Sequence, residues 1–416
     1  MQKIAIIVIS LILLGCSSSP HTESLRVDES NYLKAQIGPL EHVVDLENEP
    51  YRFWGDEVPS NLKTFPKQGI DQKTIETLKN SPSTPKVIGS QFNVLVLSGG
   101  GPRGAFGAGV INGLRDQGEL PEFSLITGVS AGALIAPFVY VGGDKYHELR
   151  DVMLGLDDSM MLGGTSILQV LFGDAFSEGN SFYQMVQKTY DDDFIDQIAK
   201  QHMTGKRMLI GTTHFDSGRQ MIWNIGRIAN SDLPNKNELI RQIFAASSSI
   251  PGVFPPQFVP VTVNGKALEE MHVDGGLSSQ LFFDPVGFDF TKLVHALGYD
   301  EPPQVYIIRN GRLKAEFEFV SDDTVSLATR SIDNLVLEQT RGDIFREMYV
   351  TKKIGATLFL TYVNDDFTVK PQASKFFDPE YLKALYHYGY EKAQSEKTWV
   401  SKLPLLRSPR PAETMP

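Results

Sequence analysis

Short apolar runs alternate with glycine-rich turns along the middle of the chain. The first run covers residues 93–98 and the second covers residues 123–127, and small residues follow each turn. Apolar runs of similar length cover residues 208–213, 220–225, 304–309 and 356–363, and a more polar run covers 266–273. Apolar runs of this length between turn residues are typical of strands. We expect a strand, a turn and a helix at each of the first two runs, and a strand pair at 208–213 and 220–225.

Apolar residues at helical spacing predict two helices in the last quarter of the chain. The first helix is expected within residues 327–349, where Ile332, Leu335, Val336, Phe345 and Met348 recur at that spacing. The second is expected over residues 379–397, because Pro379 fits the first turn of a helix.

The length and composition favour one enlarged domain over two equal ones. A chain of 416 residues with 41% hydrophobic content can bury one large core. Residues 16–90 are largely polar and predict a tether and an N-terminal segment that wraps the core. We expect the main domain at 91–310, an extension packed on it at 311–400, and a disordered, proline-containing tail at 401–416.

The amino terminus carries a targeting pattern over residues 1–15. Lys3 precedes an apolar run at 4–14 that is too short to span a bilayer, and Leu13-Leu14-Gly15-Cys16 follows. This pattern resembles a bacterial lipoprotein signal with its lipobox, which implies lipid attachment at Cys16, and Ser17 then indicates the outer membrane. The alternatives are a short transmembrane anchor and an ordinary secretory signal. Cys16 is the only cysteine, so no disulfide can form within the chain.

The net charge of -11 argues against nucleic acid as a partner and against electrostatic adhesion to anionic lipid. Membrane contact is expected through the anchor or through local apolar surface. The 8 histidines lie singly and show no metal-ligand spacing, so we expect neither a metal nor a cofactor. The sequence sets no oligomeric state.

A turn with serine at its centre, Gly128-Val129-Ser130-Ala131-Gly132, follows the second apolar run. A serine between a strand and a helix is the nucleophile-elbow pattern, in which flanking glycines remove side chains that would collide with neighbouring backbone. The small residues after the turn predict a helix whose first N–H groups and dipole point toward Ser130. Ser130 is therefore the candidate nucleophile.

The first turn, Gly99-Gly100-Gly101-Pro102-Arg103-Gly104, predicts a cradle of amides for an anion. Pro102 has no N–H, so the donors expected are the amides of Gly100, Gly101, Arg103 and Gly104. The Arg103 side chain is expected either to steer an anionic head group or to brace the turn.

The glycines of this turn have a second interpretation. Gly99, Gly101 and Gly104 also spell a dinucleotide fingerprint, with Glu119 or Glu122 near the distance of a ribose-binding acid. That interpretation leaves Ser130 unexplained. No Lys-Ser or Lys-Thr pair follows the turn, which excludes a P-loop.

A base for Ser130 is expected in Asp274-Gly275-Gly276, which follows the run at 266–273. The alternative is that Asp274 only shapes a hairpin, since Asp-Gly is a turn dipeptide. His272 lies two residues earlier, but two neighbours on one strand project side by side and do not form a Ser-His-Asp relay. We expect His272 to be a packed or exposed strand histidine.

Taken in this order, the three motifs resemble those of the patatin-like phospholipase family, and residues 245–256 resemble its segment just before the Asp. The four blocks span residues 92–285. The resemblance implies a three-layer α/β/α sandwich with a mainly parallel central sheet and a Ser-Asp dyad without histidine. It makes Ser130 the nucleophile, Asp274 the base and Gly99 to Gly104 the oxyanion loop. The family commonly has Asp where this chain has Ser98, so we expect the loop to be anchored differently.

The resemblance implies a serine acyl hydrolase that acts on lipid esters through an acyl-enzyme. An ordinary carboxylate with a pKa of about 4 is a weak base toward an alcohol, so the Ser130 hydroxyl must be poised against Asp274 and the oxyanion stabilised. A thioesterase or another deacylase stays open, and the alternative from another class is a non-catalytic envelope lipoprotein that binds lipid or a partner protein. Residues 152–176 are expected to be core helices with glycine breaks, or to line or cover an acyl-chain groove.

Overall fold

The structure is a computed structural model that describes residues 23–38, 49–59, 76, 91–158, 181–283, 301–372 and 375–403. The predicted signal peptide, the lipidation site at Cys16, most of the tether, most of 152–176 and nearly all of the tail lie outside the described residues.

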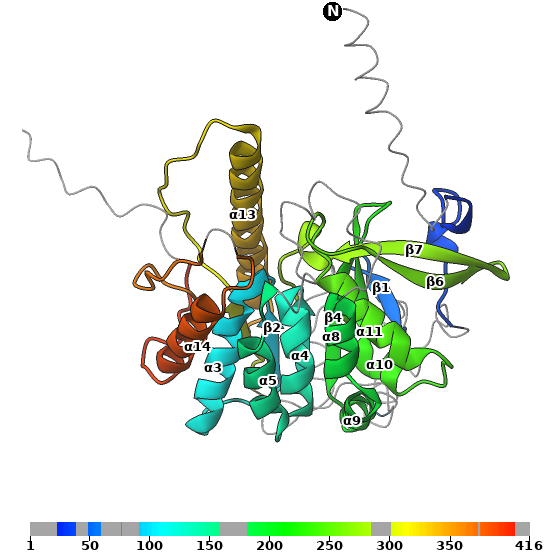
Figure 1. The fold of residues 1–416 in the computed structure, drawn as a ribbon. Helices are drawn as coiled ribbons and strands as arrows, with labels where there is room; N and C mark the ends of the chain where they lie inside the picture. The colour runs from blue at the N-terminus through cyan, green and yellow to red at the C-terminus, as the bar shows by residue number, and fades with distance from the viewer. Residues whose placement is uncertain are drawn as a thin grey trace, which may run out of the picture.

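A mostly parallel sheet runs through the middle of the molecule (Figure 1). Its strands are β1 (Arg52–Trp54), β2 (Asn93–Leu97), β3 (Leu125–Val129), β4 (Arg207–His214), β5 (Arg219–Asn224), β6 (Gln257–Val263), β7 (Lys266–Asp274), β8 (Gln304–Arg309) and β9 (Thr357–Tyr362). The strand order is β1-β5-β4-β3-β2-β8-β9, and β7 pairs with β4 and β6. In the sheet order, each neighbouring pair from β4 through β3, β2 and β8 to β9 is parallel. Strands β1, β5, β6 and β7 pair with their neighbours in antiparallel orientation. The predicted mainly parallel sheet is confirmed.

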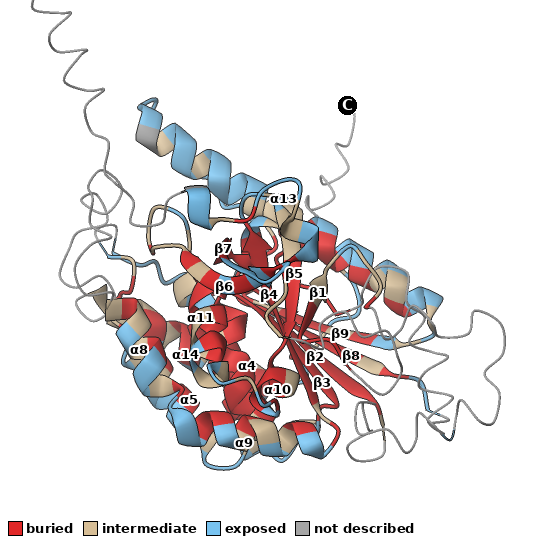
Figure 2. Cartoon of the chain, turned by 90° about the vertical axis from the view of Figure 1, so that its right-hand side faces the viewer, coloured by how far each residue is buried: buried red, intermediate tan, exposed pale blue. Residues whose placement is uncertain are grey.

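Helices cover both faces of the sheet (Figure 2). One face carries α3 (Gly104–Asp116), α4 (Ala131–Val141), α5 (Lys145–Leu154), α8 (Ser181–Thr189), α9 (Asp192–Met203), α10 (Ile225–Ala229), α11 (Lys236–Ser247) and α14 (Pro379–Ala393). The long helix α13 (Thr324–Lys353) lies on the other face. The three-layer α/β/α arrangement is therefore confirmed.

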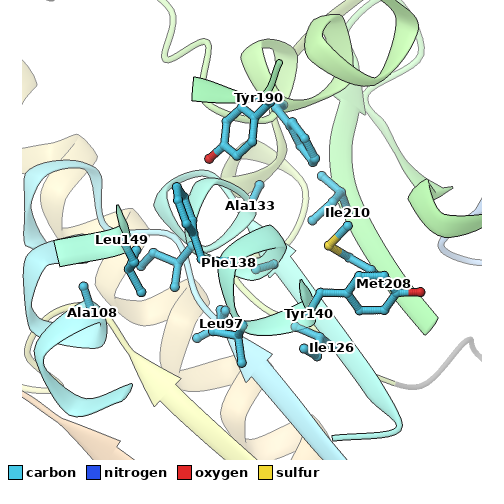
Figure 3. Close-up of a cluster of buried hydrophobic side chains, with 14 of the residues drawn as sticks. Leu97, Ala108, Ile126, Ala133, Phe138, Tyr140, Leu149, Tyr190, Met208 and Ile210 are labelled. Atoms are coloured by element: carbon cyan, nitrogen blue, oxygen red, sulfur yellow. The ribbon is translucent and has the colours of Figure 1, made fainter. Parts of the chain in front are cut away.

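Alternate residues of the strands enter two separate cores, because successive strand side chains point to opposite faces. In β2, Leu95 and Leu97 join the core under the main helical layer, whereas Val94 and Val96 join the core that includes Ile344 of α13. Figure 3 shows part of the first core, in which side chains of α4 lie against strands β3 and β4. Burial on both faces explains why the sequence shows continuous apolar runs.

The segments before and after the main domain are built into this fold. β1 pairs with β5 at one edge of the sheet, and β9 extends the other edge by pairing with β8. Helix α14 lies so close to α3 that a Cβ added to Gly109 would be 2.1 Å from the carbonyl oxygen of Tyr386. Residues 311–400 thus contribute a strand and a covering helix that pack on the central sandwich.

The predicted helix at 327–349 is present within α13, but its apolar residues are only partly buried. Ile332, Leu335 and Phe345 are exposed, as are Phe317 and Phe319 in the preceding segment. The helical spacing predicted the helix correctly. Its apolar residues pack against the core only in the second half of the helix, around Ile344 and Met348. None of the described helices has the length and apolar character needed to cross a membrane.

Candidate active site

Ser130 occupies a sharp turn between β3 and α4. Its backbone has φ 53 and ψ -123, a conformation that is strained for a residue with a side chain. The turn fits because a Cβ on Gly132 would lie 2.2 Å from the carbonyl oxygen of Leu97, so only glycine lets α4 begin this close to β2. Gly128 is similarly crowded, with Gly132 O at 2.6 Å. The local geometry is that of the predicted elbow.

The structure brings Ser130 and Asp274 together although they lie 144 positions apart in the sequence. Ser130 Oγ donates a hydrogen bond of 2.6 Å to Asp274 Oδ2. The sheet produces this contact: Asp274 ends β7 and lies opposite Thr212 of β4, and β4 is the neighbour of β3, which leads into Ser130. The other carboxylate oxygen, Oδ1, accepts the Gly276 N–H at 2.7 Å.

Burial raises the pKa of Asp274 to about 7, although the hydrogen bonds from Ser130 and Gly276 act in the opposite direction. Both dyad side chains are buried, Ser130 at 5% and Asp274 at 6% exposure. Within the described part of the chain, no cation forms an ion pair with Asp274. The carboxylate is therefore a much stronger base than an ordinary Asp, which addresses the weakness of a dyad without histidine.

Three consecutive serines at the end of α11, Ser247 to Ser249, hold both members of the pair. Ser247 Oγ accepts the Ser130 N–H at 3.0 Å and donates to Gly211 O at 2.7 Å. Ser248 Oγ donates to Ser130 O at 3.2 Å, and the carbonyl of Ser249 accepts the Asp274 N–H at 3.0 Å. The sequence of this segment indicates only a family resemblance. Its positioning role depends on contacts between segments far apart in the sequence.

The glycine loop lies beside Ser130, since a Cβ on Gly99 would be 3.3 Å from that of Ser130. Three of its amides already have acceptors: Arg103 N–H donates to Gly100 O and Gly104 N–H to Gly101 O within the loop, and Gly99 N–H donates to Gln280 O outside it. The amides of Gly100 and Gly101 donate to no acceptor among the described residues. The structure thus leaves two of the predicted loop amides open to a ligand.

Helix α4 adds further open amides on the other side of the serine. Its first N–H groups, those of Ala131 and Gly132, also have no acceptor in the ranges that the structure describes, whereas Ala133 N–H donates to Ser130 O at 2.8 Å. The start of the helix therefore presents donors beside Ser130, as the turn pattern predicted.

Ser98 anchors the loop by its hydroxyl where the family commonly has a carboxylate. Ser98 Oγ donates to Gly99 O at 2.7 Å and accepts the Asn310 N–H at 2.9 Å. The Asn310 side chain donates to Ser98 O at 2.8 Å. Arg103, by contrast, is exposed and forms no ion pair or side-chain hydrogen bond with the residues described, so it does not brace the turn by such contacts.

Aromatic rings adjoin the loop. A Cβ on Gly101 would lie 3.6 Å from the ring of Phe376. The ring of Phe254, which belongs to the segment 245–256, stacks on Phe182 at 4.3 Å and lies 6.4 Å from Phe376. Asp158 accepts the backbone N–H groups of Phe376 and Phe377. An apolar surrounding therefore lies next to the proposed anion cradle.

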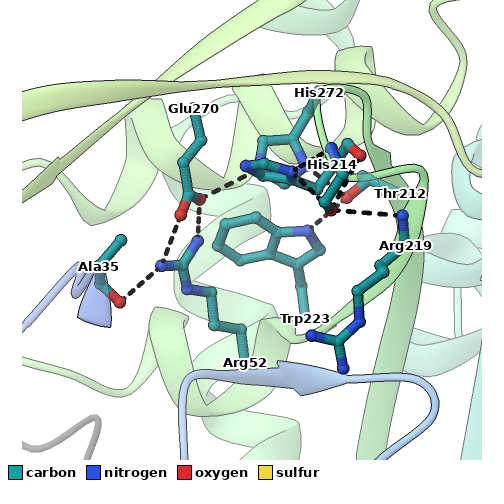
Figure 4. A network of polar contacts seen from close by, with 9 residues as sticks. Ala35, Arg52, Thr212, His214, Arg219, Trp223, Glu270 and His272 are labelled. Atoms are coloured by element: carbon teal, nitrogen blue, oxygen red, sulfur yellow. Dashed lines mark hydrogen bonds and ion pairs between the residues drawn. The ribbon is translucent and has the colours of Figure 1, made fainter. Parts of the chain in front are cut away.

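His272 lies in a separate buried network (Figure 4). Its Nδ1 is 3.0 Å from Thr212 Oγ1, its Nε2 is 3.2 Å from Glu270 Oε2, and Glu270 forms an ion pair with Arg52. Burial lowers the pKa of His272, which favours a neutral ring. His272 is a packed strand histidine, as expected, and does not bridge Ser130 and Asp274.

The dinucleotide interpretation of the glycine turn finds no support in the geometry. Glu119 and Glu122 lie beyond the end of α3, which at 13 residues spans about 20 Å, so neither can meet a ligand held at the glycine loop. Among the described residues, no group of three or more His, Cys, Asp or Glu is arranged to hold a metal ion.

Fold and site together define an α/β protein with a serine elbow at the end of a parallel strand. The chain contains a patatin-like phospholipase domain, because residues 95–286 match the model of the patatin-like phospholipase family. No curated protein sequence matches the chain.

Among solved structures, VipD from Legionella pneumophila is 16% identical with a TM-score of 0.38, over 73% of this chain and 66% of that one. ExoU of Pseudomonas aeruginosa, in complex with SpcU, is 12% identical with a TM-score of 0.30, over 75% and 52%. Human GIVD cytosolic phospholipase A2 is 10% identical with a TM-score of 0.33, over 79% and 55%. This chain therefore spans less than two thirds of the length of each.

Proposed function

We propose that this chain is a serine acyl hydrolase that cleaves lipid esters with a Ser130–Asp274 dyad. The observation that carries the proposal is the 2.6 Å hydrogen bond between Ser130 Oγ and a buried carboxylate whose pKa lies near neutrality. The patatin-like phospholipase domain at 95–286 supports lipid hydrolysis as the class of activity.

In the proposed mechanism, Ser130 Oγ attacks the ester carbonyl carbon while its proton passes to Asp274. The tetrahedral intermediate collapses, the C–O bond to the alcohol breaks, and the alcohol leaves with the proton from Asp274. Water then attacks the acyl-enzyme as Asp274 takes a proton from it. Collapse of the second intermediate returns that proton to Ser130 and releases the carboxylic acid.

The proposed oxyanion donors are the open amides of Gly100 and Gly101, with that of Ala131 on the helix side. A donor that faces a developing negative charge typically contributes about two to three orders of magnitude in rate. The rings around Phe254 and Phe376 favour an apolar acyl chain, and the exposed Arg103 supports an anionic head group.

A fluorophosphonate probe tests the proposal, because it phosphonylates only an activated serine. We expect the wild type to be labelled and to hydrolyse short-chain esters, and Ser130→Ala to do neither. Asp274→Asn should lose about three orders of magnitude in labelling rate. Ser231→Ala removes a buried hydroxyl that donates to Ile228 O and makes no hydrogen bond to the dyad, and it serves as the matched control.

The outcomes separate the candidate functions. Labelling that survives Ser130→Ala would move the nucleophile elsewhere. A wild type that is neither labelled nor active on any ester or thioester would favour a non-catalytic lipid-binding or partner-binding lipoprotein. Mass spectrometry of the products from a phospholipid with two different acyl chains, and from its lysophospholipid, would assign the bond that is cleaved.

We also propose that Cys16 carries a lipid that anchors the protein to the bacterial envelope, on the periplasmic face of the outer membrane. The support is the lipobox-like Leu13-Leu14-Gly15-Cys16 after a short apolar run. Metabolic labelling with a fatty acid should mark the wild type, and Cys16→Ala should be unlabelled and released from membranes. Unchanged membrane retention of Cys16→Ala would reject the anchor.

A further inference from the structure

Arg309 is a buried cation directly behind the glycine loop. It ends β8, is 3% exposed, and donates from Nη1 to Gly99 O at 2.8 Å and to Ser98 Oγ at 3.4 Å. It forms no ion pair within the described residues, and its Nε has no hydrogen-bond partner there. Burial lowers the pKa of Arg309 to about 9, with Arg103 acting in the same direction.

The nearby acid does not neutralise this charge by contact. Asp343 of α13 acts on Arg309 only at a distance, since its Oδ2 accepts the Gln280 N–H at 2.7 Å and its Oδ1 is 3.5 Å from Arg346. Burying a charge without a paired partner opposes folding. The arrangement therefore has a cost in stability, which a role in the site would explain.

The contacts of Arg309 converge on one peptide group. Gly99 O accepts from Arg309 Nη1 and from Ser98 Oγ, so the plane of the Gly99–Gly100 peptide is fixed. In a trans peptide the C=O and the following N–H point in opposite directions. Fixing Gly99 O therefore also fixes the Gly100 N–H, which has no acceptor among the described residues and belongs to the loop beside Ser130.

We propose that Arg309 is a positioning residue for ester hydrolysis: it orients and polarises the Gly99–Gly100 peptide so that the Gly100 N–H stabilises the oxyanion. This inference rests on the proposed function. A cation on the carbonyl side strengthens the N–H on the other side as a donor. Its charge also favours the negative charge that develops on the substrate oxygen in a site with little water.

The proposal differs from a purely structural role in what it predicts for the kinetics. Loss of oxyanion stabilisation lowers kcat and leaves KM nearly unchanged, because the oxyanion exists only in the transition state. Loss of folded protein lowers the number of active sites but not the turnover of each. Turnover must therefore be expressed per site, counted by saturating fluorophosphonate labelling.

The experiment compares Arg309→Met, Arg309→Lys and the control Arg312→Met on a short-chain ester. Arg312 is the matched control, because it also donates to backbone carbonyls, those of Asn364 and Phe367, but in a different loop. We expect Arg309→Met to lose about ten- to a hundredfold in kcat with KM within about twofold of wild type. Arg309→Lys should recover part of the loss, since it keeps the charge, and Arg312→Met should match wild type.

The outcomes separate this inference from the proposed function. If the wild type is active, Ser130→Ala is inactive and Arg309→Met turns over like Arg312→Met, the inference is overturned while the hydrolase stands. If the wild type cleaves no ester and takes no probe, both are overturned. Should Arg309→Met fail to fold, Arg309→Lys and Ser98→Ala take its place, and normal kcat in both would overturn the inference.

Discussion

At the scale of single residues, the two members of the dyad each carry a local cost. Ser130 has a strained positive φ, and Asp274 is buried without a paired cation among the described residues. Strain and desolvation of this kind persist only where surrounding contacts over-determine the conformation. The three serines at 247–249 and the Gly276 amide supply such contacts.

The pH dependence of hydrolysis follows from the pKa of Asp274. The base acts only when it is ionised, and its pKa is raised to about 7. We therefore expect kcat/KM to rise with pH through a midpoint near 7, with about a hundredfold loss at pH 5. A pH–rate profile with Ser130→Ala as the background control checks this. A profile that is flat between pH 5 and pH 8 would contradict the role of Asp274.

The raised pKa of Asp274 also predicts that stability falls over the pH range in which activity rises. Because the pKa of Asp274 is higher in the folded protein than its ordinary 3.8, its contribution to stability is full below pH 4 and is lost as pH rises through 7. The side chain in Asp274→Asn cannot ionise, so the variant should not lose this contribution as pH rises. Its free energy of unfolding, compared with that of wild type, should therefore be about 1 to 3 kcal/mol more favourable at pH 8 than at pH 5. Urea unfolding at both pH values measures the difference, and an equal effect at both would refute it.

At the scale of elements, the antiparallel side of the sheet is tied together by the network around His272. Arg52 of β1 pairs with Glu270 of β7 and donates to Ala35 O at 3.0 Å. Arg52 and His272 hold the pKa of Glu270 at about 2, although burial opposes its ionisation. The network therefore attaches the N-terminal segment to the strand that ends in Asp274.

Removing one partner of the buried Arg52–Glu270 pair should lower the free energy of unfolding more than removing both. Glu270→Gln removes the carboxylate that forms an ion pair with the buried Arg52 guanidinium, and we expect a loss of about 3 to 5 kcal/mol in free energy of unfolding. The double variant Arg52→Met with Glu270→Met should lose less, because no charge remains to desolvate. Chemical unfolding of the wild type and the two variants checks the order. A double variant that is less stable than Glu270→Gln would refute it.

At the scale of the whole molecule, the C-terminal region completes the helical layer that carries the site. Helix α3 begins at Gly104, the last residue of the glycine loop, and α14 covers it at a distance that only glycine allows. The position of the loop therefore depends on residues more than 250 positions away, which the domain match at 95–286 does not include.

A matched pair of glycine substitutions tests this packing. In Gly109→Ala the new Cβ would lie 2.1 Å from Tyr386 O, whereas in Gly342→Ala of α13 it would meet nothing within 4 Å. We expect Gly109→Ala to lose about 1 to 3 kcal/mol in free energy of unfolding, and Gly342→Ala to gain up to about 1 kcal/mol. Equal effects in thermal and urea unfolding would show that α3 and α14 can separate at little cost.

The sequence by itself determined the strands, the elbow and the order of the motifs. These are local properties: apolar runs of strand length, and glycines where a side chain would collide, as at Gly132. The mainly parallel sheet followed from the family resemblance carried by those same motifs.

Only the tertiary structure decided how these parts meet. It set Ser130 against Asp274 and aimed the serines of 247–249 at both. It also used two of the four predicted loop amides, those of Arg103 and Gly104, inside the turn. It placed Arg309 behind that turn and left Ile332 and Leu335 of α13 exposed. The physical reason is that hydrogen bonding, burial and the pKa of a carboxylate depend on neighbours in space, which no local pattern of residues specifies.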